Sequence, residues 1–496
     1  MAQTKTKSVV CSIIGSFVLA LLQPLETCIA TTAHSQQRPP NIVFIFADDH
    51  AVQAMGAYPS WLHDFVEKQN ITPNIDRLAK DGVVFANSFC ANSICAPSRA
   101  CVLTGKHSAL NGVTRWQKFD GSQTTFPKLL QNAGYQTAIV GKWHLVSDPT
   151  GFDFWRVLPG QGAYINPEFI SSNGTNRIMG YTTDIITDIA LDWLAKQRDA
   201  SKPFMLMIHH KAPHRNWMPA PKYAHWLEDV KIPEPPTLFD DYSDRTPSAA
   251  KQEMEIGRHM TLKSDLKIDP AEFAKLGLTG QDIVRWKYQR YMQDYLRCVK
   301  SVDDNVGRVR DYLKQAGLDT NTVVIYSSDQ GFYLGEHGWF DKRWMYEESL
   351  RMPLIVSWPG VTKPGARPAQ LVQNIDYAPT FLEMAGVPVP AEMQGVSLTP
   401  LLHGKSPTDW RASIYYHYYD YLGEHRVECH EGVRTEQYKL INFYSPGDWE
   451  LYDLATDPSE LHNVYTNPAY AKTASQLKVE LARLKRQYHI PSNPAQ

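Results

Sequence analysis

The chain has 496 residues, 43% of them hydrophobic, and its formal net charge at pH 7 is -2. This length exceeds the size at which one hydrophobic core usually suffices, so we expect one large and one smaller domain. A nearly neutral chain is a poor general binder of polyanions, and nucleic acid is not expected as a partner. Any binding of anions must therefore depend on a local cluster of positive charges.

The N-terminal segment has the pattern of an export signal. Lys5 and Lys7 precede an apolar run at residues 9–22, which is too short to span a bilayer comfortably, since spanning takes about 20 apolar residues. With a cleavage point after Ala30, residues 1–30 are predicted to be a signal peptide. We expect the mature chain to be exported, periplasmic or secreted, without stable membrane insertion. An uncleaved anchor is the alternative.

Five cysteines follow the expected signal peptide, namely Cys90, Cys95, Cys101, Cys298 and Cys429. They are too few for a disulfide scaffold, and their odd number leaves at least one of them unpaired. A bridge between Cys90 and Cys101 is conceivable, but the sequence leaves the pairing open.

The first predicted strand covers residues 41–47, a continuous and largely apolar run of the kind that is buried on both faces of a parallel sheet. Asp48 and Asp49 follow it directly. Ligands of such sheets bind beyond the carboxyl ends of the strands. Because adjacent carboxylates repel each other, a hard divalent cation is predicted here, with a solvated acidic turn as the alternative.

A cysteine at a predicted helix start is the most informative local feature. Pro97 suits the first turn of a helix, and Gly105 is a typical residue at its end. Cys95 is then expected just outside the helix N-terminus, near unpaired N–H groups, with Arg99 one turn further on. This geometry predicts an anion site beside a sulfur atom. The alternative is a buried cysteine in a helix-capping turn.

Two further apolar runs lead into basic residues. The predicted strand at residues 135–140 precedes Lys142 and His144, which in extended backbone point the same way and can reach one ligand. The predicted strand at residues 203–208 leads to His214, which follows a proline and is a better candidate for chemistry than the two histidines at the strand end. Surface lysine and histidine residues are the alternative for each pattern taken alone.

A third polar cluster follows the predicted strand at residues 322–326, where Asp329 and Gln330 occur. Polar clusters at the ends of several apolar strands are hard to explain as independent coincidences. Downstream, residues 335–348 form a loop dense in charged and aromatic side chains. A solvated turn would leave those aromatic side chains oddly exposed.

Helical patterns separate these strands. The predicted helices cover residues 72–80, 126–132, 183–196, 282–315 and 375–385. Together with a strand at residues 354–357, the alternating order predicts an α/β fold with a mostly parallel sheet flanked by helices. The polar, irregular stretch at residues 231–280 is predicted to cross the surface and to shape a substrate cleft.

The pattern changes after residue 403. Shorter, antiparallel strands are predicted at residues 414–419, 432–443 and 450–454, and a closing helix at residues 471–487. We therefore expect a large catalytic domain at residues 38–403 and a smaller α+β C-terminal subdomain with an antiparallel sheet at residues 404–496.

These motifs, taken in order, resemble the type I sulfatases of the alkaline phosphatase-like superfamily. They are Asp48-Asp49, Cys95-Ala96-Pro97-Ser98-Arg99, Gly141-Lys142-Trp143-His144, Ala212-Pro213-His214 and Ser328-Asp329-Gln330-Gly331. The resemblance extends over nearly the whole mature chain. It implies that the side chain of Cys95 is oxidised to formylglycine (3-oxoalanine) by a formylglycine-generating maturation enzyme, a partner that the chain then requires.

The same resemblance implies a calcium site. Ca²⁺ would be bound by Asp48, Asp49, Asp329 and Gln330 together with the modified side chain of Cys95. Many family members carry Asn or His where this chain has Gln330. A glutamine amide oxygen can still bind calcium, and glutamine here is similar to a carbohydrate-sulfatase subgroup.

Catalytic roles also follow from the resemblance. Arg99, Lys142 and Lys342 would neutralise the sulfate oxygens together with the calcium ion. A hydroxyl of the hydrated formylglycine would attack sulfur. His214, with Lys342, would protonate the departing sugar oxygen, and His144 would help to remove a proton from the second hydroxyl so that sulfate is expelled.

The substrate implied by the resemblance is a sulfated carbohydrate. The loop around Asp341 and the segment near Trp449 look like those of bacterial carbohydrate sulfatases, including N-acetylglucosamine-6-sulfatases. On this analogy Asp341 and Arg343 would bind sugar hydroxyls. The remaining candidate residues are Trp344, which could stack on a sugar, and His425 or His430, which could form the pocket wall. Glycosaminoglycan and algal polysaccharide both stay open.

Two other functions remain as alternatives. A phosphomonoesterase or phosphodiesterase of the same superfamily would share the metal carboxylates, but it normally has serine or threonine as the nucleophile, where this chain has Cys95. A glycan-binding protein without catalytic activity would not need the complete set of candidate residues. Turnover of sulfate and phosphate esters by the matured protein distinguishes these possibilities.

Overall fold

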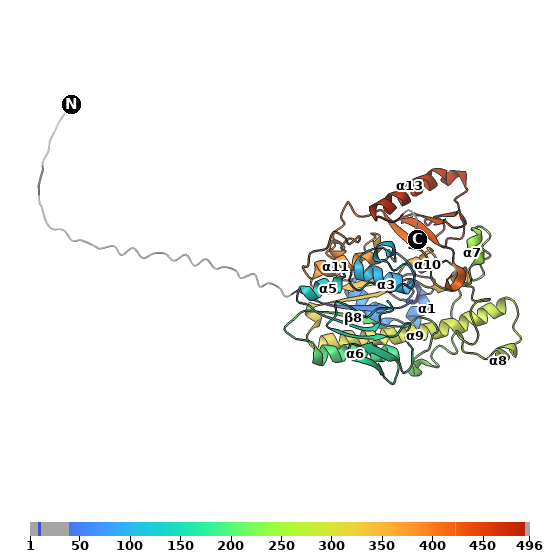
Figure 1. Cartoon of the computed structure of the whole chain (residues 1–496), viewed down its shortest axis with the longest axis horizontal. Coiled ribbons are helices and arrows are strands. Elements are labelled where there is room, and N and C mark those ends of the chain that lie inside the picture. Colours follow the sequence, from blue (N-terminus) through green and yellow to red (C-terminus); the bar gives the residue numbers. More distant parts are fainter. Residues whose placement is uncertain (1–7, 11–38, 422, 492–496) are drawn as a thin grey trace, which may run out of the picture. The chain divides into compact units, whose positions relative to one another are not determined.

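The computed structural model describes residues 8–10, 39–421 and 423–491 (Figure 1). Most of the expected signal peptide lies outside these residues. In the described part of the chain, no helix combines the length and the apolar character needed to cross a membrane. The residues from Pro39 onward form one compact unit. A boundary at residues 403 and 404 stays a prediction.

A nine-stranded sheet runs through the centre of this unit, in the order β2-β12-β9-β1-β8-β4-β5-β6-β7. Its middle is parallel: β1 (Asn41–Ala47) lies between β8 (Phe204–His209) and β9 (Thr322–Ser328), and β4 (Gln136–Lys142) pairs with β8. All seven residues of β1 are buried. The continuous apolar runs therefore form the buried parallel strands that the sequence predicts.

The two margins of this sheet contain antiparallel strands. On one side β12 (Leu354–Ser357) runs antiparallel to β9 and pairs with β2 (Val83–Val84). On the other side β5 (Phe154–Leu158) is parallel to β4, and the hairpin of β6 (Glu168–Ser171) and β7 (Gly174–Arg177) continues the sheet. The sequence predicts no strand between residues 154 and 177, because these short, half-exposed segments lack a continuous apolar run.

Helices cover both faces of the sheet (Figure 1). Side chains of Val43 and Ile45 share a core with one set of helices, α2 (Pro73–Asp81), α6 (Thr182–Asp192) and α9 (Gln281–Gln315). Side chains of Ile42 and Phe44 share a core with the other set, α3 (Cys95–Thr104), α5 (Phe126–Asn132) and α11 (Tyr377–Met384). The alternation of side chains along β1 thus feeds two separate cores, and the predicted helix-flanked α/β fold is confirmed.

The C-terminal region adds a four-stranded antiparallel sheet in sequential order. Its strands are β14 (Ser413–Tyr418), β15 (His430–Thr435), β16 (Tyr438–Phe443) and β17 (Asp448–Asp453). Helix α13 (Ala471–Gln487) packs against it. The single strand predicted at residues 432–443 is wrong: a tight turn divides it, and the hydroxyl of Thr435 bonds the backbone of Tyr438 across that turn.

The remaining elements are short. The helices are α1 (His63–Lys68), α4 (Ser108–Asn111), α7 (Pro247–Lys251), α8 (Pro270–Ala274), α10 (Glu347–Leu350) and α12 (Thr399–Leu402). The strand pairs are β3 (Ser88–Phe89) with β13 (Val372–Gln373), and β10 (Tyr333–Leu334) with β11 (Phe340–Asp341). Because β1, β4, β8 and β9 are parallel, their carboxyl ends meet at one edge of the sheet, where the candidate site lies.

Candidate active site

The ends of β1 and β9 bring four predicted metal ligands together. Carboxylate oxygens of Asp48, Asp49 and Asp329 all lie within 4.8 Å of one another. The backbone N–H of Asp49 donates to Asp329 Oδ1 at 3.2 Å, and the amide nitrogen of Gln330 donates to Asp49. All four side chains are fully buried.

This cluster suits a hard divalent cation. Asp48 Oδ1 and Gln330 Oε1 are buried and have no hydrogen-bond partner among the described residues. Burial raises the pKa of Asp49 to about 7, although the neighbouring ammonium of Lys342 acts in the opposite direction. Crowded carboxylates with spare oxygens are stabilised when a cation offsets their charge, and an all-oxygen donor set is typical of Ca²⁺.

Cys95 lies beside this cluster at the start of α3. Its Sγ is within 4.8 Å of a carboxylate oxygen of Asp48 and a ring nitrogen of His214. The prediction that Cys95 lies outside the helix is wrong: the N-cap is Ile94, whose carbonyl accepts from the N–H of Ser98 at 2.9 Å, so the first turn includes Cys95. Gly105 ends the helix with φ 64°, as predicted. Burial raises the pKa of the Cys95 thiol to about 12.

Three buried cations pair with the three carboxylates. The guanidinium of Arg99 donates to Asp329 Oδ2 through Nε at 3.1 Å and Nη2 at 2.9 Å. Lys342 Nζ lies 2.8 Å from Asp49, and Lys142 Nζ donates to Asp48. The three ion pairs therefore lie together beside Cys95, since Asp48 is within 4.8 Å of its Sγ and the three carboxylates are within 4.8 Å of one another. A cation bound by the carboxylates would leave the three basic side chains free to contact an anion.

The two predicted histidines occupy different positions. His214 lines the cavity, and its Nε2 is 3.9 Å from Asp49 Oδ2. The ring of His144 lies 5.5 Å from that of Trp116, and its Nδ1 has no partner in the described structure. Burial lowers the pKa of both side chains, so both imidazoles are neutral at pH 7.

The backbone around His144 differs from the prediction. Strand β4 continues through Lys142, and His144 follows it with φ 59°. The two side chains therefore do not project from one extended segment. Positive φ turns His144 out of the strand direction, and its ring lies near Trp116, which lines the cavity.

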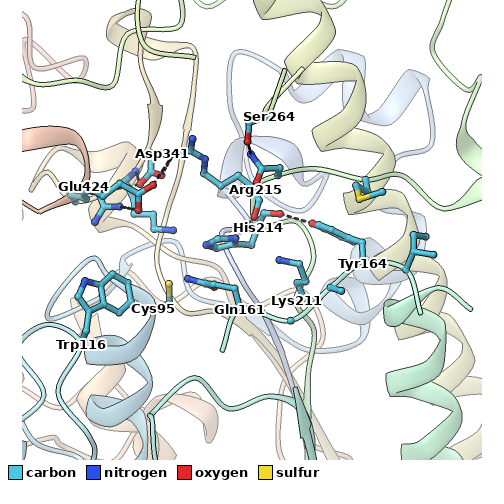
Figure 2. A pocket seen from close by; sticks show the side chains of 17 residues that line it. Cys95, Trp116, Gln161, Tyr164, Lys211, His214, Arg215, Ser264, Asp341 and Glu424 are labelled. Carbon is cyan, nitrogen blue, oxygen red and sulfur yellow. Dashed lines mark hydrogen bonds and ion pairs between the residues drawn. The ribbon is translucent and has the colours of Figure 1, made fainter. Parts of the chain in front are cut away.

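A cavity of about 600 Å³ opens above Cys95 (Figure 2). This volume lies in the range of ligand-binding pockets. Three predicted residues from the end of β11 and the following loop line it, namely Asp341, Lys342 and Arg343. Arg343 Nε lies 3.4 Å from Asp341 Oδ1, and Arg343 Nη2 lies 3.3 Å from Glu424 Oε2. The wall thus offers both donors and acceptors to a ligand.

The other predicted substrate residues lie behind this wall. His425 Nε2 is 3.1 Å from Asp341 Oδ2, so His425 supports Asp341 without lining the cavity. Trp344 and His430 are fully buried, with ring centroids 5.8 Å apart, in an aromatic cluster that includes Phe443. Neither of them lines the cavity, so their contact with a sugar stays a prediction that this packing does not support.

Several residues that line the cavity are not predicted from the sequence. They are Trp116, Gln161, Lys211, Arg215, Asn216, Ser264 and Glu424. Lys211 and Arg215 flank His214 in the chain, which is a signal that could have identified them. Ser264 belongs to the irregular stretch predicted to shape a cleft, and its position supports that prediction. Gln161 and Glu424 carry no distinguishing pattern.

Comparisons with known proteins agree with this geometry. A family model described as Sulfatase matches residues 40–387, and one described as N-sulphoglucosamine sulphohydrolase, C-terminal, matches residues 335–487. An N-acetylglucosamine-6-O-sulfatase of Bacteroides thetaiotaomicron is 45% identical over 97% of this chain and 93% of its own length. The human N-acetylglucosamine-6-sulfatase is 30% identical over 78% of this chain and 68% of its own length.

Solved structures are also similar. A sulfatase in complex with its substrate D-glucosamine-2-N,6-O-disulfate superposes with a TM-score of 0.89 at 45% identity, covering 92% of this chain and 99% of that chain. A phosphonate monoester hydrolase of Agrobacterium radiobacter shares the fold, with a TM-score of 0.71 at 21% identity over 90% of this chain and 96% of that chain. The chain belongs to the sulfatase family and is a sulfuric ester hydrolase with the alkaline phosphatase-like fold.

Proposed function

We propose that this sulfatase removes the 6-O-sulfate from a glucosamine residue of a sulfated carbohydrate, with Ca²⁺ and a formylglycine at position 95. The observation that carries the proposal is the buried ring of three carboxylates and three cations around Cys95, which faces a cavity large enough for a sugar. The relatives at 45% and 30% identity act, by their names, on N-acetylglucosamine 6-sulfate.

Binding of the scissile sulfate would rest on the ring of charges. Asp48, Asp49, Asp329 and Gln330 would hold the Ca²⁺ ion, which supplies positive charge to the sulfate oxygens when it is bound. Arg99, Lys142 and Lys342 would contact the same oxygens. Because these basic groups are buried, their interaction with developing negative charge is strong and needs little reorganisation.

The nucleophile would be a hydroxyl of the hydrated formylglycine, which supplies an attacking oxygen once Cys95 has been oxidised. The buried Cys95 thiol, with its pKa near 12, is protonated at pH 7 and is a weak nucleophile without that modification. The buried carboxylate of Asp329 is one of the groups that would orient the modified side chain at position 95. The maturation enzyme is thus part of the proposal.

Proton transfer would depend on the two histidines. His214 Nδ1 lies against the carbonyl oxygen of Arg215, which leaves Nε2 facing the cavity and Asp49. An arriving sulfate adds negative charge and favours the protonated imidazole, which would then protonate the departing sugar oxygen from Nε2. His144 is neutral and would accept a proton from position 95.

We also propose that the protein is exported, with residues 1–30 removed as a signal peptide. The charged N-terminus and the short apolar run at residues 9–22 support this. An extracellular or periplasmic location suits an enzyme that acts on a glycan too large to enter a cell. Identification of the N-terminus of the purified, exported protein tests this assignment.

The test uses protein produced together with a formylglycine-generating enzyme. Peptide mass spectrometry should find an aldehyde in place of the Cys95 thiol, and N-acetylglucosamine 6-sulfate should release sulfate with a change of the NMR signals at C6. Protein produced without the maturation enzyme is the matched control and should be inactive. Turnover of 3-O- or 4-O-sulfated glucosamine but not of the 6-O ester, or a thiol throughout despite active maturation, would contradict the proposal.

A further inference from the structure

Lys211 is a buried cation that lacks an ionic partner in the described part of the chain. The side chain follows β8, lines the cavity, and is only 4% exposed. Among the described residues it makes no side-chain hydrogen bond, and no carboxylate lies within 4 Å of it. Its Nζ lies 4.8 Å from the ring centroid of Tyr164. A buried ammonium without a counter-charge is costly, so this side chain points to a ligand that supplies negative charge.

The other cations that line the cavity are already paired. Lys342 contacts Asp49 at 2.8 Å. Arg343 lies 3.4 Å from Asp341, and Arg215 lies 3.0 Å from Asp265 Oδ1. Among these described cations of the cavity wall, Lys211 therefore differs in having no carboxylate partner. Burial lowers the pKa of Lys211 to about 8, so the group still carries its charge at pH 7.

Lys211 lies on the side of the cavity where Tyr164 also lines it. In the view of Figure 2, Gln161 lies between Cys95 and Lys211, and Lys211 lies beside Tyr164. In a pyranose ring C2 lies opposite C5, the atom that carries C6. A sugar whose 6-O-sulfate sits at Cys95 therefore extends its C2 substituent away from Cys95, and the part of the cavity lined by Lys211 and Tyr164 is open to such a substituent.

We propose that Lys211 binds a second anionic group of the substrate, an N-sulfate at C2 of the glucosamine, and so favours N-sulfated over N-acetylated substrates. This inference rests on the proposed function. The substrate named for the similar complex, D-glucosamine-2-N,6-O-disulfate, carries both groups on one sugar. An ammonium that meets a sulfate in a buried cavity forms a charge-assisted hydrogen bond, stronger than a neutral one.

The experiment compares matured wild type with Lys211→Met on two substrates, glucosamine 2-N,6-O-disulfate and N-acetylglucosamine 6-sulfate. Methionine keeps the length of the side chain and removes its charge. We expect the ratio of kcat/KM between the disulfated and the N-acetylated substrate to fall about tenfold or more, mainly through KM. Lys222→Met, which removes an exposed lysine paired with Asp304, is the matched control and should leave the ratio unchanged.

The outcomes separate this inference from the proposed function. An equal loss of kcat/KM on both substrates would assign Lys211 to the scissile sulfate and overturn the inference. No loss of kcat/KM on either substrate would overturn it as well, because Lys211 would then contact neither sulfate. Wild type that hydrolyses neither substrate would refute the proposed function and the inference together. The melting temperature of Lys211→Met should not fall, because the substitution removes a buried charge that has no counter-charge among the described residues; a fall would show that the lysine stabilises the fold itself.

Discussion

Asp48, Asp329 and Lys142 lie at the ends of strands β1, β9 and β4, whereas Ser264 and Glu424, on the wall of the same cavity, come from segments outside any regular strand or helix core. The first group is fully buried and is fixed by the register of a parallel sheet. Glu424 is 59% exposed at its side chain. The strand ends thus fix the positions of Asp48, Asp329 and Lys142, whereas loops contribute Ser264 and Glu424 to the wall of the cavity.

The largest expected effect falls on Cys95, which lies at the start of α3 beside the carboxylates of the strand ends. Cys95→Ser, with the serine shown by mass spectrometry to be unoxidised, should lower kcat by at least about 10³-fold, because an unmodified serine provides no aldehyde hydrate, while the fold remains intact. Sulfate release and thermal unfolding measure the two effects. Cys101→Ser, another buried cysteine of α3, is the matched control and should retain turnover. Near-normal rates for Cys95→Ser would refute covalent chemistry at this position.

Removal of the bound cation should have the second-largest effect on activity. Chelation should abolish most activity and lower the melting temperature, and added Ca²⁺ should restore both. A ligand present at 100 times its Kd stabilises a protein by about 2.7 kcal/mol. Asp48→Asn should lose this calcium-dependent stabilisation, whereas Asp304→Asn, at a residue that pairs with Lys222 and does not line the cavity, should keep it. A calcium-dependent melting temperature that survives in Asp48→Asn would place the cation elsewhere.

The loop-built wall should show smaller changes, chiefly in KM. Asp341→Asn leaves Arg215 and Arg343 with less negative charge to hold them, and kcat/KM should fall about 10- to 100-fold. Glu424 contacts the same two arginines, but its side chain is exposed. Glu424→Gln should therefore change kcat/KM by no more than a few-fold. Equal losses for the two variants would show that burial does not decide their contributions.

The pH dependence of stability should reveal how the hairpin of β10 and β11 is held. Burial by itself lowers the pKa of His337. The hydrogen bond to Asp240 at 2.9 Å and the negative charge of Glu348 outweigh this effect and raise the pKa to about 9. Because this value exceeds the unfolded value of 6.5, the stabilisation is complete below pH 6.5 and is lost as pH rises through 9.

The free energy of unfolding should therefore fall by up to about 3 kcal/mol over that interval. Denaturant titrations at several pH values measure this slope. His337→Gln should flatten it, and His225→Gln, an exposed histidine, should not. An unchanged slope in His337→Gln would assign the pH dependence to other groups.

The smallest effect on the fold is expected at the mouth of the cavity. Trp116 is 41% exposed and lines the cavity, so Trp116→Ala should raise KM a few-fold without lowering stability. Trp344→Ala should instead cost about 3–5 kcal/mol of stability, because Trp344 is enclosed by other aromatic side chains. Stability curves and KM values of the two variants provide the check, and the opposite pattern would restore a sugar contact for Trp344.

The sequence alone determined the buried strands and the polar side chains at their ends. Strand β1 and helix α13 follow the predicted bounds, because a continuous apolar run and a helical period are local properties of the chain. Asp48, Lys142 and Asp329 can be grouped from their positions along the chain, since each follows or ends an apolar strand and the carboxyl ends of parallel strands share one edge. Motif resemblance added the expected roles of Cys95 and His214.

Only the tertiary structure decided which side chains face the ligand beyond that edge. Trp344 and His430 have a sequence context as suggestive as that of Asp341, yet they pack in an aromatic cluster and do not line the cavity, whereas Asp341 does. Gln161, Ser264 and Glu424 reach the cavity from segments without periodicity, and the isolation of the Lys211 charge among the described residues follows only from the positions of all its neighbours. The burial of a side chain and the pairing of its charge depend on residues that are distant in the chain, so a local sequence pattern does not predict them.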